Sequence, residues 1–182
     1  MELQEDIRII RRRGWIVVAL ALLTAVAAYG FSKAQVTIYE ASVKLTVRPA
    51  RADWGLSNAL SALLRSLAGD ITTHSFLQDV IDREQLDMTT DDLLDGRTVF
   101  VRDEGSDFTI QITVRDPSDK VAVNLVNAIA DLFIEKREEW NQRQNKSDRI
   151  EVEIRDRARS ADVYSPKTRF NVAAGGVLGG LI

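Results

Sequence analysis

Two kinds of hydrophobic pattern occur along this chain: uninterrupted apolar stretches near its ends, and periodic apolar and polar positions between them. Residues 14–32, GWIVVALALLTAVAAYGFS, contain no charged side chain. At about 1.5 Å per residue this stretch reaches roughly 28 Å, close to the roughly 30 Å of a bilayer's hydrocarbon core. Because its apolar side chains leave no polar face, the pattern predicts a transmembrane helix.

Charges around this helix predict its orientation. Arg11, Arg12 and Arg13 precede it, and only Lys33 follows closely. By the positive-inside rule, residues 1–13 are expected in the cytoplasm and the domain that follows outside.

A cleaved secretory signal and a twin-arginine export signal are the two alternatives. Residues 25–27, Ala-Val-Ala, have the small-x-small form of a cleavage site. The apolar stretch is longer than a usual signal core, however, and the leader mixes acids with its arginines. The sequence therefore favours an uncleaved anchor.

The middle of the chain predicts a domain of helices and strands over residues 33–116. Residues 37–48 alternate apolar and polar side chains, as a half-buried strand does. Residues 97–102 and 108–115 are expected to form a hairpin. Helical spacing appears over residues 56–68, with Gly69 as an expected C-terminal cap, and over residues 75–83. A third, short helix is expected after Thr89, and Gly96 is expected to stop it.

A long helix is expected to complete the domain over residues 117–163. Asp116 is predicted to cap it. Its first half carries an apolar stripe, whereas its second half is mostly charged, with Glu151 and Glu153 each four residues before an arginine. A helix with so narrow an apolar seam is predicted to project from the domain or to pack on another subunit. Residues 141–147 are a candidate break.

The final stretch has the composition of a second membrane helix. Residues 164–170 form a linker that contains Pro166, and residues 171–182 are uncharged. The latter reach roughly 18 Å, so we expect them to be the truncated start of a second transmembrane helix. Two overlapping GxxxG spacings predict that another helix approaches closely, although glycine is common in membrane helices in general. These glycines are Gly175, Gly176, Gly179 and Gly180.

Together these patterns predict an α+β protein: two transmembrane helices flanking an extracytoplasmic α/β domain, with a small mixed or antiparallel sheet and one long projecting helix. The net charge of −3 does not suit general binding to nucleic acid. The chain has no cysteine, which excludes disulfides and thiolate metal sites.

No catalytic, cofactor-binding or metal-binding constellation is recognisable. His74 stands alone, and a metal site needs several ligands at set spacing. The acidic groups after Thr89 and around Glu104 are expected to be a solvated helix start and a hairpin turn. Trp54 could stack on a sugar ring, but packing within a loop is the simpler interpretation. The sequence predicts a protein that is not an enzyme.

Four segments resemble the Wzz-type chain-length determinants, also called polysaccharide co-polymerases. Residues 39–45 (YEASVKL) are similar to the family's first strand, and residues 75–81 (SFLQDVI) to its characteristic helix. Residues 110–117 (IQITVRDP) resemble its strand-to-helix junction, and residues 165–171 (SPKTRFN) its segment before the second membrane helix. The family often has several prolines there, whereas this chain has only Pro166.

The resemblance implies a multi-pass protein of a bacterial inner or cell membrane that forms homo-oligomers. Such proteins regulate the chain length and export of O-antigen, capsule or exopolysaccharide. The partners implied are a separate polysaccharide polymerase, a separate or C-terminal tyrosine kinase, the lipid bilayer and the polysaccharide itself. The alternative is the extracellular sensor domain of a two-helix membrane receptor.

Overall fold

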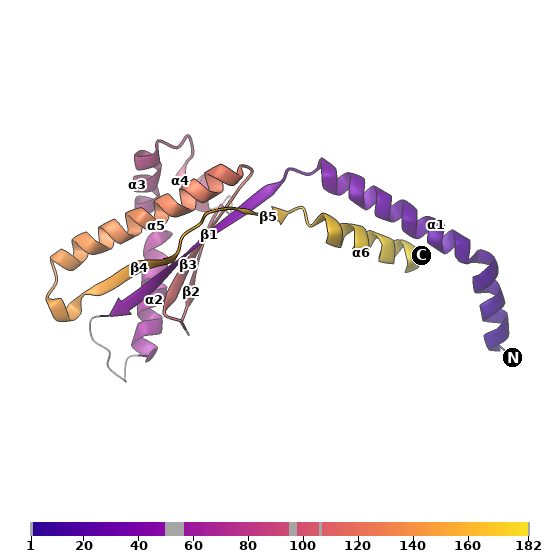
Figure 1. The fold of residues 1–182 in the computed structure, drawn as a ribbon, viewed down its shortest axis with the longest axis horizontal. Coiled ribbons are helices and arrows are strands. Elements are labelled where there is room, and N and C mark those ends of the chain that lie inside the picture. The colour runs from indigo at the N-terminus through magenta and orange to yellow at the C-terminus, as the bar shows by residue number, and fades with distance from the viewer. Residues whose placement is uncertain (1, 50–56, 95–97, 106, 182) are drawn as a thin grey trace. The chain divides into compact units, whose positions relative to one another are not determined.

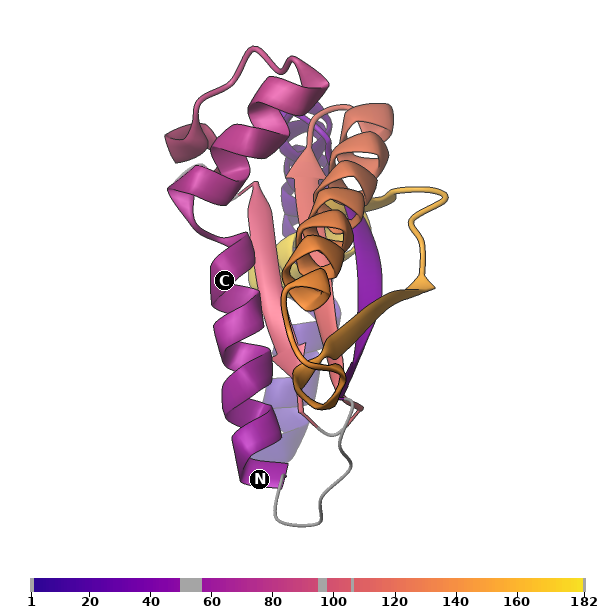
Figure 2. The same cartoon turned by 90° about the vertical axis from the view of Figure 1, so that its left-hand side faces the viewer.

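The chain divides into two compact units in a computed structural model that describes residues 2–49, 57–94, 98–105 and 107–181. One unit joins the two ends of the chain, Met1–Ile38 and Val163–Ile182, and the other comprises Tyr39–Asp162. The central unit is α+β, as the sequence predicts. Figures 1 and 2 show its helices and strands from two directions.

The central unit is built on a small antiparallel sheet. Four of its five described strands are β1 (Ile38–Pro49), β2 (Val99–Glu104), β3 (Thr109–Asp116) and β4 (Ile150–Asp156). They lie in the order β2-β3-β1-β4, so β1 pairs with β3 on one side and with β4 on the other (Figure 1). The expected hairpin over β2 and β3 is confirmed.

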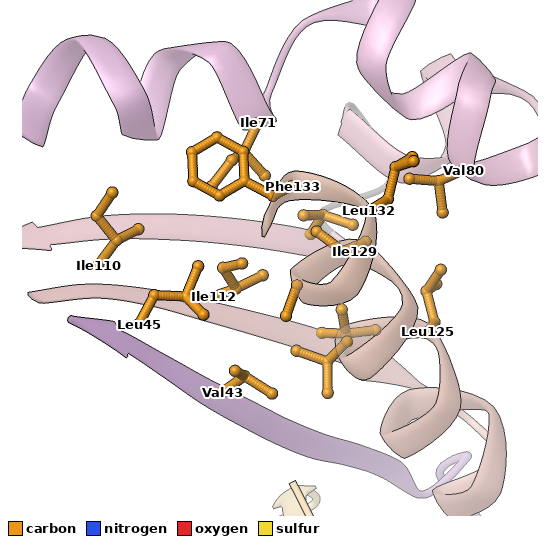
Figure 3. Packing of buried hydrophobic residues seen from close by; sticks show 14 of the residues in the cluster. Val43, Leu45, Ile71, Val80, Ile110, Ile112, Leu125, Ile129, Leu132 and Phe133 are labelled. Atoms are coloured by element: carbon orange, nitrogen blue, oxygen red, sulfur yellow. The ribbon is translucent and has the colours of Figure 1, made fainter. Parts of the chain in front are cut away.

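One face of this sheet forms the hydrophobic core. Strand residues alternate between the two faces, so every second side chain points the same way. The buried set comprises Ala41, Val43, Leu45, Val47, Val99, Ile110, Ile112, Val114 and Val152. Figure 3 shows side chains of the helices packed against this face. Burying each large aliphatic side chain is worth about 1.5–3 kcal/mol, which makes this face the main source of stability.

The helices that the structure describes between β1 and β2 follow the predicted order. They are α2 (Ser57–Ile71), α3 (His74–Glu84) and α4 (Thr90–Leu94). The prediction that Gly69 caps α2 is wrong, because the helix continues to Ile71 and buries that side chain completely. The proposed stop of α4 at Gly96 lies outside the described residues, as does Trp54.

The long helix predicted over residues 117–163 is wrong in its second half. Helix α5 (Asp119–Gln142) is followed by a short 3-10 turn, η2 (Lys146–Asp148), and then by β4. Apolar Ile150, Val152 and Ile154 alternate with charged residues, and this period of two matches a strand that pairs with β1. The predicted helical ion pairs of Glu151 and Glu153 therefore do not form along a helix.

The beginning of α5 also differs in detail from the prediction. Ser118, not Asp116, is the N-cap, and its hydroxyl accepts from the Val121 backbone N–H. Asp116 instead accepts a hydrogen bond of 2.7 Å from the Ser118 backbone N–H, which forms a turn just before the helix. The apolar stripe of α5 is buried along the middle of the helix, whereas Val121 and Trp140 near its ends stay partly exposed.

The second face of the sheet is lined by polar side chains that pair across strands. Ser42 and Thr113 lie opposite each other, and their hydroxyls are 2.9 Å apart. Arg115 donates to Glu40 at 2.7 Å and lies over the Phe100 ring at 4.2 Å. These pairs use the register that the core face imposes, because one register sets both faces of a sheet.

Candidate functional site: the glycine-seamed helix pair

The unit formed by the chain ends contains two apolar helices. Helix α1 (Glu2–Ala34) includes Gly14–Ala34, the one segment of the described residues that is long and apolar enough to cross a membrane. Helix α6 (Thr168–Leu181) has 14 residues, which cover about 21 Å. The two helices pack against each other within this unit (Figure 1).

The contact between these helices depends on two glycines of α6. A Cβ atom added at Gly175 would lie 2.8 Å from the Ala28 Cβ and 3.0 Å from the Thr24 carbonyl oxygen. At Gly179 it would lie 2.0 Å from the Thr24 hydroxyl oxygen and 2.9 Å from the Leu20 carbonyl oxygen. Backbone atoms cannot move aside as a flexible side chain can, so only glycine allows this approach.

The other two glycines of the predicted motif have more room. A Cβ at Gly176 would be 3.8 Å from the Ala25 Cβ, and one at Gly180 would be 4.0 Å from the Ala21 Cβ. These are ordinary van der Waals distances. Of the two GxxxG spacings, Gly175 and Gly179 therefore make the close contact with α1 of the same chain. We call these two positions the glycine seam.

Polar side chains interlock the same two helices. The Ser32 hydroxyl donates to the Thr168 hydroxyl at 3.0 Å and accepts from the Asn171 side-chain amide at 3.3 Å. Ser32 is only 1% exposed, so these bonds satisfy a buried hydroxyl. Thr24, at the glycine seam, donates to backbone carbonyls of α1, so its hydroxyl is hydrogen-bonded within its own helix.

Aromatic residues mark the two ends of the apolar surface. Trp15 lies near the start of the candidate span, and Tyr29 and Phe31 lie about 21–24 Å further along α1. Phe170 of α6 is exposed as well. Tryptophan and tyrosine gather at both interfaces of a bilayer, so this spacing suits the edges of a hydrocarbon layer.

The remaining predicted site residues flank this pair. Arg11, Arg12 and Arg13 belong to the continuous backbone of α1, and their side chains lie outside the described part of the structure. Pro166 lies between β5 (Asp162–Ser165) and α6, and its carbonyl accepts from the Thr168 backbone N–H at 2.9 Å.

The pKa values of two carboxyl groups in the central unit, Asp92 and Glu104, are lowered by hydrogen bonds to neighbouring side chains and backbone. Asp92 accepts from the Thr89 backbone N–H at 2.9 Å and from its hydroxyl at 2.7 Å, and these bonds lower its pKa. The Thr89 hydroxyl in turn accepts from the Asp92 N–H, which completes a reciprocal cap of α4. Lys44, 3.2 Å away, lowers the pKa of Glu104.

Of the residues weighed as metal ligands from the sequence, His74 lies close to the acidic start of α4, with Nδ1 3.7 Å from a carboxylate oxygen of Asp91. His74 contacts the Thr90 hydroxyl at 2.9 Å through Nδ1. Among the residues that the structure describes, no three histidine, aspartate or glutamate side chains are grouped so that they could hold a metal ion.

Sequence reasoning missed the residues of α1 that face the glycines. Thr24, Ala28 and Ser32 follow one another at intervals of four, and so do Ala21 and Ala25. This small-xxx-small spacing is the signal that could have identified the partner of the GxxxG motif. Asn171 carried no such signal, because its contact with Ser32 joins positions far apart in the sequence.

No protein-family model matches the chain, and none of the curated proteins compared with it matches.

Proposed function

We propose that this protein is a membrane scaffold that oligomerises and regulates the chain length and export of a bacterial surface polysaccharide. The observation that carries the proposal is the glycine-seamed pair of apolar helices that brackets an α+β unit. Large side chains such as Leu22, Leu23 and Val26 project from α1 with most of their surface exposed. A continuous apolar surface of this kind indicates a membrane or partner contact.

In this proposal both α1 and α6 lie in the bilayer. Their contact uses the means available in lipid, where the hydrophobic effect between helices is weak: close backbone approach and interhelical hydrogen bonds. The arginines before the candidate span keep the N-terminus in the cytoplasm, and residues 39–162 lie outside.

The resemblance to Wzz-type co-polymerases supports the choice of function. Of the four segments that carry the resemblance, residues 39–45 lie in β1, residues 75–81 in α3, and residues 110–117 run from β3 to the turn before α5. Residues 165–171 run from the end of β5 into α6. The proposed role is stoichiometric: identical copies present a shared surface beside a separate polymerase, with a tyrosine kinase as a further partner.

A deletion strain tests this role. We expect the length distribution of its surface polysaccharide on a gel to shift and the wild-type gene to restore it. Gly180→Ala should restore it as well, whereas Gly179→Leu should not, because the leucine has no space against α1. An unchanged distribution in the deletion strain would refute the proposal.

The mass of the particle in detergent tests the oligomeric part. A scaffold of this kind is expected to purify as a particle of many copies of the 20.3 kDa chain. A sensor, the alternative function, should instead leave polysaccharide length unchanged and respond to an extracellular ligand. A monomeric particle together with a normal length distribution would favour the sensor.

A further inference from the structure

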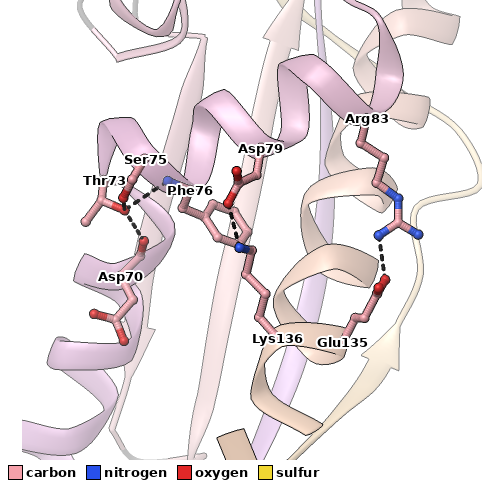
Figure 4. Close-up of polar contacts among 8 residues, drawn as sticks. All are labelled: Asp70, Thr73, Ser75, Phe76, Asp79, Arg83, Glu135 and Lys136. Carbon is pink, nitrogen blue, oxygen red and sulfur yellow. Dashed lines mark hydrogen bonds and ion pairs between the residues drawn. The ribbon is translucent and has the colours of Figure 1, made fainter. Parts of the chain in front are cut away.

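A small hollow lies where three helices of the central unit meet. It measures about 200 Å³ and is lined by Asp70 of α2, Phe76 of α3, and Phe133, Lys136, Arg137 and Trp140 of α5. Sites for drug-sized ligands span about 300–1,000 Å³, so this hollow has room for one ring-sized group. Figure 4 shows the helices around it.

Aromatic residues make up three of the six residues that line it. Phe76 and Phe133 are buried and meet edge to face, with ring centroids 6.1 Å apart. Trp140 keeps 37% of its surface exposed, although it lies on the helix that supplies much of the core. A wide apolar ring at the rim of a hollow offers a flat surface on which another ring can stack.

Each cation in the wall already has an anionic partner. The Arg137 guanidinium donates to Asp70 at 3.3 Å, and Lys136 donates to Asp79 of α3 (Figure 4). Arg137 also lies over the Phe133 and Trp140 rings, at 5.7 and 5.2 Å from their centroids. Its side chain is only 13% exposed, and this burial lowers its pKa while Asp70 opposes the shift.

These pairs decide which kind of ligand suits the hollow. An anion would have to displace Asp70 from Arg137, and a cation would have to separate the same pair. A hydroxyl group both donates and accepts, so it can bond to the Asp70 carboxylate and to guanidinium N–H groups without disturbing their balance. A ring that carries several hydroxyls and one apolar face fits both the pairs and Trp140.

We propose that this hollow binds one uncharged pyranose residue of a polysaccharide, stacked on Trp140 and hydrogen-bonded to Asp70 and Arg137. The C–H groups of a pyranose face carry slight positive charge and pack on the negative face of an indole ring. The inference rests on the proposed function, since it names the polymer contact of that scaffold.

Neighbouring contacts hold the hollow in shape before any ligand arrives. Thr73 caps α3 by accepting from the Phe76 backbone N–H, and its own hydroxyl donates to the Asp70 carbonyl at 2.8 Å (Figure 4). Arg83 of α3 pairs with Glu135 of α5, and this pair ties α3 to α5 one helical turn from the pair of Asp79 and Lys136. A wall that is already ordered loses little entropy on binding.

Saturation-transfer NMR on the full chain in lipid nanodiscs tests the proposal. The probes are maltoheptaose and the corresponding oligomers of mannose and galactose, with oligogalacturonate as the acidic comparison. We expect transfer to the pyranose C–H protons of at least one neutral oligomer. Trp140→Ala should weaken that binding about tenfold, and Trp140→Phe should weaken it less. Val121→Ala, an equally exposed position on α5, is the control and should bind as wild type.

A second variant tests the charge argument independently. Asp70→Asn leaves Arg137 without its carboxylate, so the preference should shift from neutral oligomers toward oligogalacturonate. The proposal is overturned if wild type binds only oligogalacturonate, if it binds none of the neutral oligomers, or if Trp140→Ala binds as wild type does. These readouts do not depend on polysaccharide length in cells. Sugar binding without a length phenotype would therefore refute the proposed function and leave this site standing.

Discussion

Gly179 shows how one missing side chain determines a helix contact. A methyl group there would overlap the Thr24 hydroxyl and press on the backbone of α1, whereas one at Gly180 would find ordinary van der Waals distances. Two glycines next to each other in the sequence therefore differ in their tolerance of alanine. The difference arises because adjacent helical positions point about 100° apart, and only one of them faces the partner directly.

An engineered disulfide measures this difference. The chain has no cysteine, so Ala25→Cys with Gly176→Cys introduces the only two. The Cβ positions lie 3.8 Å apart, which matches the mean Cβ separation of about 3.8 Å in disulfides. We expect oxidation to link α1 to α6. After the chain is cleaved between these helices, the linked fragments should then run as one larger band on a non-reducing gel. Adding Gly179→Ala should reduce the linked fraction severalfold, whereas adding Gly180→Ala should not. Equal linked fractions with Gly179→Ala and with Gly180→Ala would contradict a closer contact of α1 with Gly179 than with Gly180.

Asp92 gives a prediction about pH. Its pKa lies below the ordinary value of 3.8 because Thr89 donates two hydrogen bonds to the carboxylate. An NMR titration of the Asp92 carboxyl carbon should therefore show a midpoint below 3.8. Thr89→Ala should raise the midpoint only partway, because the backbone N–H remains, and Thr90→Ala should leave it unchanged.

The sign of the stability effect follows from the same pKa. The unfolded chain binds the proton more tightly than the folded chain, so this cap stabilises the fold fully above about pH 4. The contribution is lost as the pH falls through the lower, folded-state pKa. An Asp92 midpoint at or above the ordinary value would contradict this assignment.

Among the elements, β4 is the one whose identity depends on its surroundings. Residues 150–156 alternate like a strand, but their charges also fit helical spacing. Asn141, near the end of α5, helps to decide between them: its side-chain amide donates to the Ile150 carbonyl at 2.7 Å and its oxygen accepts from the Ile150 N–H at 2.9 Å. This pair of bonds places the first residue of β4 beside the end of α5, where the chain turns back to pair with β1.

Asn141→Ala should therefore weaken the central unit measurably. It would leave a half-buried N–H and C=O of Ile150 without their partners, at a cost of about 1–3 kcal/mol. Urea unfolding followed by circular dichroism measures the change. Asn145→Ala is the matched control, since this exposed side chain makes no capping bond to η2 and should change stability by less than about 0.5 kcal/mol. Equal effects of the two substitutions would show that the Asn141 contacts do not stabilise β4.

For the molecule as a whole, the proposed topology predicts which segments are reached from each side of the membrane. Protease added outside spheroplasts should cleave within residues 39–162, while an N-terminal tag before Arg11 stays protected until the membrane is opened. The protein should stay with the membrane fraction after an alkaline wash, because an apolar helix pair does not leave lipid when surface charges change. A fully protected central unit, or recovery in the wash, would contradict the topology.

The pairing of α1 with α6 also constrains how copies could assemble. Because the tight glycine seam is occupied by the same chain, an oligomer cannot use Gly175 and Gly179 between copies without first separating this pair. The sequence predicted that another helix approaches these glycines closely. The structure shows that this helix is α1 of the same chain, so contacts between copies would involve other surfaces.

Local patterns in the sequence were enough to predict the apolar α1, the strands β1, β2 and β3, the positions of α2 and α3, and the apolar stripe of α5. Each has a period or a cap that its own residues express. Long-range contacts were needed to show that residues 150–156 form a strand and that two of four glycines meet Thr24 and Ala28. The same kind of contact brought Asp70, Arg137 and Trp140 around one hollow. Such features join residues far apart in the chain. There the free energy gained by burying surface and forming hydrogen bonds with a distant partner outweighs the local preference of the residues for a helix or a strand.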